Sequence, residues 1–152
     1  MITYITGSLF DTAKIAFGHG VNIEGKMGSG IAVPVRNMYP ENYRIYLEAC
    51  NNGTLKPGMV LPVKDNGKIV LNIASQDKPG PHARLEWLAS GLNKARIFCE
   101  ERGLDGFAIP RIGAGVGGLD WSDIEVIINK LFSESEIELE IWTLPEELEK
   151  YS

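Results

Sequence analysis

The chain has 152 residues and a formal net charge of -5, with 44% hydrophobic and 23% charged residues. This length and composition are typical of one globular domain with a sizeable core. The acidic balance, without a basic cluster, argues against binding to the phosphate backbone of nucleic acid, so we expect no direct readout of nucleic-acid sequence.

Two further features of the sequence bear on its location. The first ten residues, MITYITGSLF, have neither the basic region nor the long apolar region of a secretory signal, and the apolar runs are too short to span a membrane. Cys50 and Cys99 show no zinc-binding or redox spacing and lie beside apolar residues, which indicates buried free thiols in a reducing compartment. We therefore expect a cytoplasmic protein with no membrane partner, metal site or cofactor.

The first half of the chain alternates short strands with helices. Strands are expected at 2–6 and 14–21, where β-branched and aromatic residues are frequent. A helix at 31–38 contains Pro34, which should kink it or delay its start. A clearer helix at 40–51 has proline in its first turn.

The second half begins with two strands, 59–63 and 69–74, joined by Lys64-Asp65-Asn66-Gly67, in which Asn-Gly is a strong hairpin signal. A polar loop then leads to the longest helical pattern, 82–102, in which apolar residues recur every three or four positions. A buried strand at 106–109 and a loop at 110–119 come next. They are followed by a helix at 121–132, a final strand at 137–144 and a short charged tail at 145–152.

This order of elements predicts the fold class α/β, with helices on both faces of a largely parallel sheet and one hairpin mixed in. No internal repeat, linker or low-complexity segment interrupts it, so we expect residues 1–152 to form a single domain. Ligands of such sheets usually bind where loops leave the carboxyl ends of the strands.

Two glycine-rich loops occupy that position. GVNIEGKMGSGIA, residues 20–32, follows the strand at 14–21, and PRIGAGVGGL, residues 110–119, follows the strand at 106–109. Glycine lacks Cβ and reaches positive φ, so successive N–H groups can converge on one anion, and a following helix adds its own free N–H groups. Two facing loops would fit a diphosphate. Tight turns and close helix–sheet packing are the alternative explanation, because neither loop has a Walker A or dinucleotide-binding pattern.

The segments HGVNIEGKMGSGIA, MYPENY and IPRIGAGVGGLDW resemble the macro domain family, and the similarity covers residues 2–144. The branch to which the chain is most similar contains the terminal ADP-ribose protein glycohydrolase and a compact ADP-ribose-1″-phosphate phosphatase. The resemblance implies a three-layer α/β/α sandwich with a mixed sheet. It also implies a cleft for a small-molecule ADP-ribose derivative, free or attached to an ADP-ribosylated macromolecule.

The same resemblance assigns the ligand-binding positions. The adenine would lie near Ser8, which stands where many family members have an acidic residue, and the distal ribose would lie near Asn22. The residues expected to bind the ligand are Gly7, Ser8, Leu9, Asn22, Gly28, Ser29, Gly30, Ile31, Ser75, Gly113, Ala114, Gly115, Val116, Gly117 and Gly118.

Departures from the family pattern bear on the chemistry. The glycohydrolases of this branch use a lysine and an aspartate at positions that match Gln76 and Gly117, so a lysine-dependent mechanism is doubtful here. The phosphatase-like member also lacks the lysine, and it shares a histidine three residues before the asparagine. The resemblance therefore favours a hydrolase, a phosphatase acting on ADP-ribose-1″-phosphate.

Asn22 and His19 are the catalytic candidates for that reaction, because histidine titrates near neutral pH. His19 also fits a hydrogen-bonded core residue, His82 fits a solvated helix start, and the substrate phosphate could activate its own water. Three other functions stay open: a non-catalytic binder of ADP-ribose or a related NAD-derived nucleotide, an ADP-ribosyl glycohydrolase with a non-standard site, and a protein–protein adaptor with a vestigial cleft.

Overall fold

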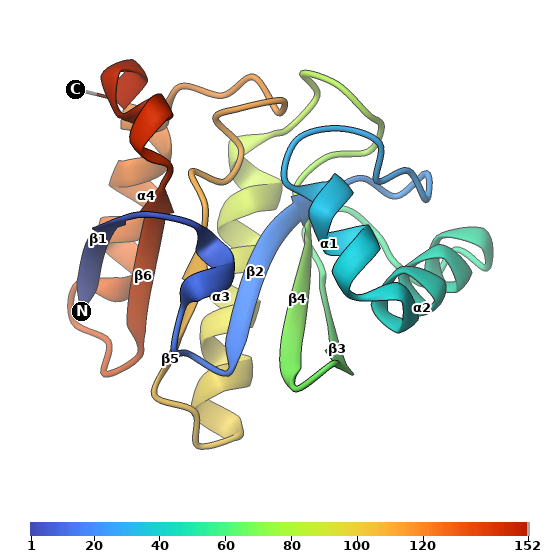
Figure 1. Cartoon of the computed structure of the whole chain (residues 1–152), viewed down its shortest axis with the longest axis horizontal. Helices are drawn as coiled ribbons and strands as arrows, with labels where there is room; N and C mark the ends of the chain where they lie inside the picture. Colours follow the sequence, from blue (N-terminus) through green and yellow to red (C-terminus); the bar gives the residue numbers. More distant parts are fainter. Residues whose placement is uncertain (152) are drawn as a thin grey trace.

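The computed structural model describes residues 1–151, which form a six-stranded sheet with helices on both faces (Figure 1). The strand order is β1-β6-β5-β2-β4-β3, and every neighbouring pair is parallel except β3 and β4. The strands are β1 (Ile2–Thr6), β2 (Ala16–Val21), β3 (Val60–Asp65), β4 (Lys68–Ala74), β5 (Gly106–Ile109) and β6 (Glu138–Thr143). The helices are η1 (Leu9–Asp11), α1 (Ala32–Met38), α2 (Pro40–Asn51), α3 (Leu85–Glu101), α4 (Trp121–Phe132) and η2 (Pro145–Tyr151).

Two separate sets of core residues show that the sheet is the middle of three layers. Successive side chains of a strand point to opposite faces, so Leu71 packs with α3 and α4 whereas Val70 packs with Val35 and Tyr39 on the α1 side. The central strands β2, β4 and β5 are almost wholly buried. The predicted α/β class, with a mixed and largely parallel sheet, is therefore confirmed.

The hairpin between β3 and β4 forms as predicted from Asn66-Gly67. Asn66 has φ 48° and Gly67 has φ 78°, the two positive values that a type I′ turn requires. Pairing continues to Asp65 and Lys68 on either side of this turn, so β3 ends two residues later than expected.

The long helix α3 begins at Leu85 rather than at 82. Gln76 and Ala83 form an isolated antiparallel bridge, and the Arg84 N–H donates to the Ser75 carbonyl, so these residues stay extended. Helix α1 is continuous from Ala32 to Met38 and begins one residue later than expected. Pro34 does not interrupt it, because proline falls in the first turn, where the missing N–H has no helical partner to lose. The tail at 145–151 forms η2, and residue 152 lies outside the described residues.

The carboxyl ends of the parallel strands lie along the upper edge of the sheet in Figure 1, and the two glycine-rich loops leave from that edge. Within residues 1–151, no helix combines the length and the apolar character needed to cross a bilayer.

Candidate functional site

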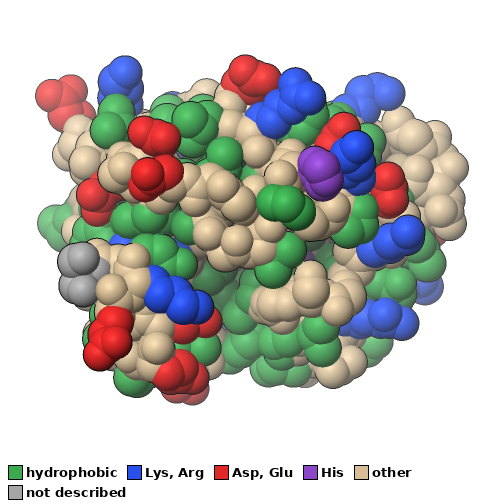
Figure 2. Space-filling view, turned by 90° about the horizontal axis from the view of Figure 1, so that it is seen from above, with side chains coloured by type: hydrophobic (Ala, Val, Ile, Leu, Met, Phe, Trp, Pro, Cys, Tyr) green, Lys and Arg blue, Asp and Glu red, His purple; other side chains and the backbone are tan. Residues whose placement is uncertain are grey.

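A cleft of about 1080 Å³ opens at the carboxyl ends of the strands. Its walls come from both glycine-rich loops, from the segment after β1, from the loop after β4 and from η2. Figure 2 looks onto this edge and shows hydrophobic side chains and backbone in its middle, with charged side chains mostly towards the periphery. All the residues predicted to bind the ligand line the cleft except Gly118. Gly118 lies behind the loop, where a Cβ would meet the Cβ of Pro81 at 2.8 Å.

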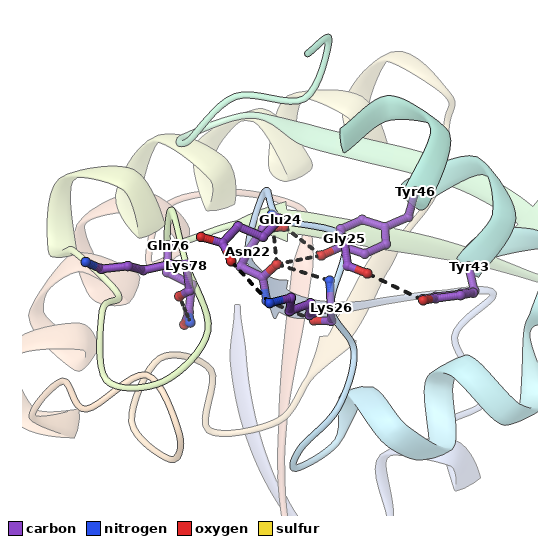
Figure 3. A network of polar contacts seen from close by, with 8 residues as sticks. All are labelled: Asn22, Glu24, Gly25, Lys26, Tyr43, Tyr46, Gln76 and Lys78. Carbon is purple, nitrogen blue, oxygen red and sulfur yellow. Dashed lines mark hydrogen bonds and ion pairs between the residues drawn. The ribbon is translucent and has the colours of Figure 1, made fainter. Parts of the chain in front are cut away.

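The Asn22 side chain organises the first loop from within. Its Oδ1 accepts from the backbone N–H groups of Glu24, at 3.0 Å, and Lys26, at 3.3 Å. Its Nδ2 donates to the Lys26 carbonyl at 2.8 Å. Figure 3 shows the amide at the centre of this network. The amide is thus largely occupied by the loop, and its catalytic use stays a prediction.

Two tyrosines of α2 support the same loop. The Tyr46 hydroxyl lies 2.7 Å from the Asn22 carbonyl and 3.0 Å from Asn22 Oδ1, and the Tyr46 side chain is fully buried. Burial raises the pKa of Tyr46, so its hydroxyl keeps its proton and remains a donor. Tyr43 donates to the Gly25 carbonyl at 3.4 Å. The loop conformation therefore depends on contacts from a helix that begins 18 residues after Asn22.

Glycines leave open space at two points of the cleft wall, one in each loop. A Cβ added at Gly28 or Gly115 would meet no heavy atom within 4 Å. Gly30 has φ 61°, in the left-handed region, and a Cβ there would come within 3.4 Å of the Val116 side chain. The two loops therefore approach each other near Gly30 and Val116, and Gly28 and Gly115 both line the cleft.

The second loop owes its shape to its other glycines. Gly113 has φ 80°, and its carbonyl accepts from the Leu119 N–H at 2.9 Å. A Cβ on Gly117 would lie 2.8 Å from that same carbonyl oxygen and 2.9 Å from Cβ of Ala83. Tight packing thus explains Gly117, whereas no contact of the protein itself explains Gly115. Of the two explanations for the glycine-rich sequence, tight packing applies at Gly117, and space for a ligand is the one left for Gly115.

Comparison with known proteins agrees with this architecture. A family model described as Macro domain matches residues 19–128. The chain belongs to the macro domain family.

Named relatives of this macro domain act on ADP-ribose derivatives. The DNA ADP-ribosyl glycohydrolase of Mycobacterium tuberculosis is 33% identical over 129 residues, which are 82% of this chain and 37% of that protein. The ADP-ribose 1''-phosphate phosphatase of Candida albicans is 26% identical over 140 residues, 82% of this chain and 90% of that protein. The chain spans about two fifths of the length of the first curated relatives that it matches.

A solved structure described as the macrodomain of Mycobacterium tuberculosis DarG has a TM-score of 0.85 and 30% identity, covering 93% of this chain and 97% of that one. The macrodomain of Thermus aquaticus DarG gives the same TM-score at 25% identity, with the same coverage. The predicted three-layer sandwich is confirmed by these neighbours.

Gln76 of this macro domain holds the loop after β4. Its side-chain amide donates to the carbonyl oxygens of Lys78, at 2.7 Å, and Gly80, at 3.0 Å. Ser75 and Gln76 both line the cleft at the end of β4, beside the end of β2. The amide cannot form a covalent adduct with a sugar as an amine would, and both of its donor hydrogens are used within the loop.

His19 lies in the core rather than in the cleft. Its side chain is fully buried, and Nε2 lies 2.9 Å from Oδ1 of Asn72, while Nδ1 has no hydrogen-bond partner within residues 1–151. Burial lowers the pKa of His19 to about 4. In this conformation the ring reaches no ligand in the cleft, so the core role is the one that the structure supports. His82, beside the β4–α3 loop, is exposed and does not line the cleft.

Arg111 projects from the second loop into an aromatic cluster. Its Cζ lies 4.5 Å from the ring centre of Tyr151, 4.7 Å from Trp121 and 5.2 Å from Tyr4. Its Nε donates to Oγ1 of Thr143 at 2.7 Å. Arg111 therefore links η2 to the second loop, because a cation over the face of an aromatic ring is stabilised electrostatically.

The tail and two loop residues add charged groups that are not among the predicted ligand-binding residues. Among residues 1–151, the charged side chains that line the cleft are Lys26, Arg111, Glu147 and Lys150. The charge that they carry is thus net positive in a chain of net charge -5. A lysine within an otherwise side-chain-poor loop was the one sequence signal for Lys26, whereas nothing local indicated that η2 folds back onto the cleft. Within the same residues, no three potential metal-binding side chains lie together.

Proposed function

We propose that this macro domain binds an ADP-ribose derivative in the cleft and hydrolyses ADP-ribose-1″-phosphate. The observation that carries the proposal is the open space over Gly28 and Gly115, which belong to different loops and line one cleft whose charged side chains are net positive. The names of the relatives support the choice of ligand, since they include phosphatases and glycohydrolases of ADP-ribose compounds.

In the proposed complex the diphosphate lies between the two loops. Residues 28–31 approach it from one side and residues 113–117 from the other, with main-chain N–H groups as donors. Gly7, Ser8 and Leu9 contact the adenine end, and the distal ribose with its phosphate lies near Asn22 and Ser75. The binding free energy of the diphosphate depends mainly on how many N–H groups donate to it, because each hydrogen bond to a charged group contributes roughly 1.5–3 kcal/mol.

The hydrolytic step is proposed to be assisted by the substrate itself. Water attacks phosphorus and passes one proton to a phosphate oxygen. As the bond between phosphorus and the C1″ oxygen breaks, that proton moves to the C1″ oxygen, which gives ADP-ribose and inorganic phosphate. The protein orients the phosphate and stabilises the developing charge through loop N–H groups. Asn22 is a positioning residue in this scheme, because its amide holds the loop that supplies them. His19 takes no part, since its ring is buried away from the cleft.

The second candidate function is binding without turnover. It is favoured by Gln76, whose amide is engaged within its own loop, and by Gly117, which offers no carboxylate. The ligand in that case is ADP-ribose itself or an ADP-ribosylated macromolecule. For either function we propose a cytoplasmic location, which the free thiols Cys50 and Cys99 support.

Calorimetry with ADP-ribose tests the binding proposal, and phosphate release from ADP-ribose-1″-phosphate tests the reaction. We expect saturable binding, release by the wild type, and at least tenfold slower release by Asn22→Ala. Binding with equally slow release by both proteins would leave the binder as the function. The absence of saturation at millimolar ADP-ribose would refute both candidates.

A further inference from the structure

Lys26 combines a fixed backbone with a largely exposed amine at the cleft wall. Its N–H donates to Asn22 Oδ1 and its carbonyl accepts from Asn22 Nδ2, so both sides of the residue are held by one amide. The side chain is 66% exposed, and its Nζ lies 3.7 Å from Oε1 of Glu24, an ion pair too long for a good hydrogen bond. Figure 3 shows the side chain turned back towards Glu24 beside Asn22.

The other two cations of the cleft are placed differently. Arg111 is enclosed by three aromatic rings and bonded to Thr143, which keeps its guanidinium in one place. Lys150 lies on η2, after β6, whereas Lys26 follows β2, two strands further along the sheet. Lys26 therefore supplies a largely exposed positive charge at the β2 end of the cleft, which is also lined by Ser75 and Gln76 after the adjacent β4.

We propose that Lys26 determines specificity for a ligand whose distal ribose carries a phosphate. The inference rests on the proposed function, because it places the distal ribose beside Asn22. A phosphomonoester carries up to two negative charges near neutral pH, whereas ADP-ribose has a neutral hydroxyl at the same position. The Lys26 ammonium attracts the first group and gains little from the second, so it raises the preference for the phosphorylated ligand without being needed for binding.

The experiment compares two dissociation constants, one for ADP-ribose and one for the non-hydrolysable methylenephosphonate analogue of ADP-ribose-1″-phosphate. The quantity of interest is their ratio, which isolates the contribution of the distal phosphate from any change that weakens both ligands equally. We expect Lys26→Gln to weaken binding of the phosphonate about fivefold and binding of ADP-ribose less than twofold, because exposed ion pairs are worth at most about 1 kcal/mol. Lys26→Arg should restore most of the preference.

Glu24→Gln gives a test of opposite sign. Removing the carboxylate frees the Lys26 amine, so the preference for the phosphonate should rise by about twofold. Lys78→Gln is the control, since Lys78 is exposed on the neighbouring loop and does not line the cleft. It should leave both constants unchanged.

Three results separate this inference from the proposed function. An unchanged ratio in Lys26→Gln, with ADP-ribose still bound by the wild type, would overturn the role of Lys26 alone. A loss of preference in Lys150→Gln instead of Lys26→Gln would overturn it too, by placing the phosphate at the η2 end. Failure of the wild type to bind ADP-ribose would refute the proposed function itself.

Discussion

Two glycines of the second loop, Gly115 and Gly117, lie two residues apart and should respond in opposite ways to the same added methyl group. At Gly115 a Cβ would project into the open cleft, with no heavy atom within 4 Å. At Gly117 it would lie 2.8 Å from the Gly113 carbonyl oxygen, and backbone must move to accept it. Gly115→Ala therefore tests the ligand site, and Gly117→Ala tests the packing of the loop.

The sizes of the two effects follow from these contacts. Overpacking costs about 1–3 kcal/mol, and replacing glycine in a compatible conformation returns about 0.4–1 kcal/mol through the unfolded chain. We expect Gly117→Ala to be less stable by about 1–2 kcal/mol, a fall in Tm of roughly 2–8 °C for a chain of this length. Gly115→Ala should change stability by less than about 1 kcal/mol. It should nevertheless weaken ADP-ribose binding about tenfold or more, the loss of one charge-assisted hydrogen bond.

Urea unfolding and calorimetry on the same preparations separate stability from affinity. A Gly115→Ala protein with wild-type affinity would refute the idea that main chain at this position contacts the ligand. A Gly117→Ala protein with unchanged stability would show that the loop relaxes freely. Gly30 is less suitable for such a test, because its φ of 61° makes any side chain strained whether or not a ligand binds.

Three further predictions concern residues outside the loop. Burial lowers the pKa of His19 from 6.5 to about 4, so the unfolded chain takes up a proton that the native chain does not. The free energy of unfolding should therefore fall as the pH drops from 6.5 to 4, by about 3 kcal/mol in total, and urea unfolding of His19→Gln should lack this component. Tyr46→Phe removes the donor to Asn22 and should cost about 1–3 kcal/mol in unfolding free energy; an unchanged value would mean that the loop holds without it. Burial raises the pKa of Cys99 to about 12, so intact mass after reaction with a thiol reagent at pH 8 should show modification of half-buried Cys50 only, and of both cysteines in urea.

Features set by neighbouring residues could be predicted from the sequence. The hairpin turn at Asn66-Gly67 follows from two residues that tolerate positive φ. Helix α4 begins at Trp121 and ends at Phe132 as expected, and Asp120 caps it by accepting from the Ser122 N–H at 3.0 Å. Both signals act within a few residues, so they do not depend on the rest of the fold.

Features set by distant residues could not be predicted in the same way. The start of α3 was misplaced because the bridge between Gln76 and Ala83 competes with the first helical turn. His19 was a catalytic candidate because of its type and spacing, but it pairs across the sheet with Asn72, 53 residues away. The sequence located the glycine-rich loops, whereas the hydrogen bonds of the Asn22 amide became visible only in three dimensions.

We expect the guanidinium of Arg111, which three aromatic rings enclose, to influence the rate of ligand association as well. Its side chain is already oriented by these contacts, so it gives the lining of the cleft a positive charge in a fixed place. The net charge of -5 repels an approaching anionic ligand. The positive charge of Arg111 attracts the same ligand once it comes within roughly one Debye length. Moderate salt should therefore alter the association rate of a small nucleotide only slightly, because it screens both fields together.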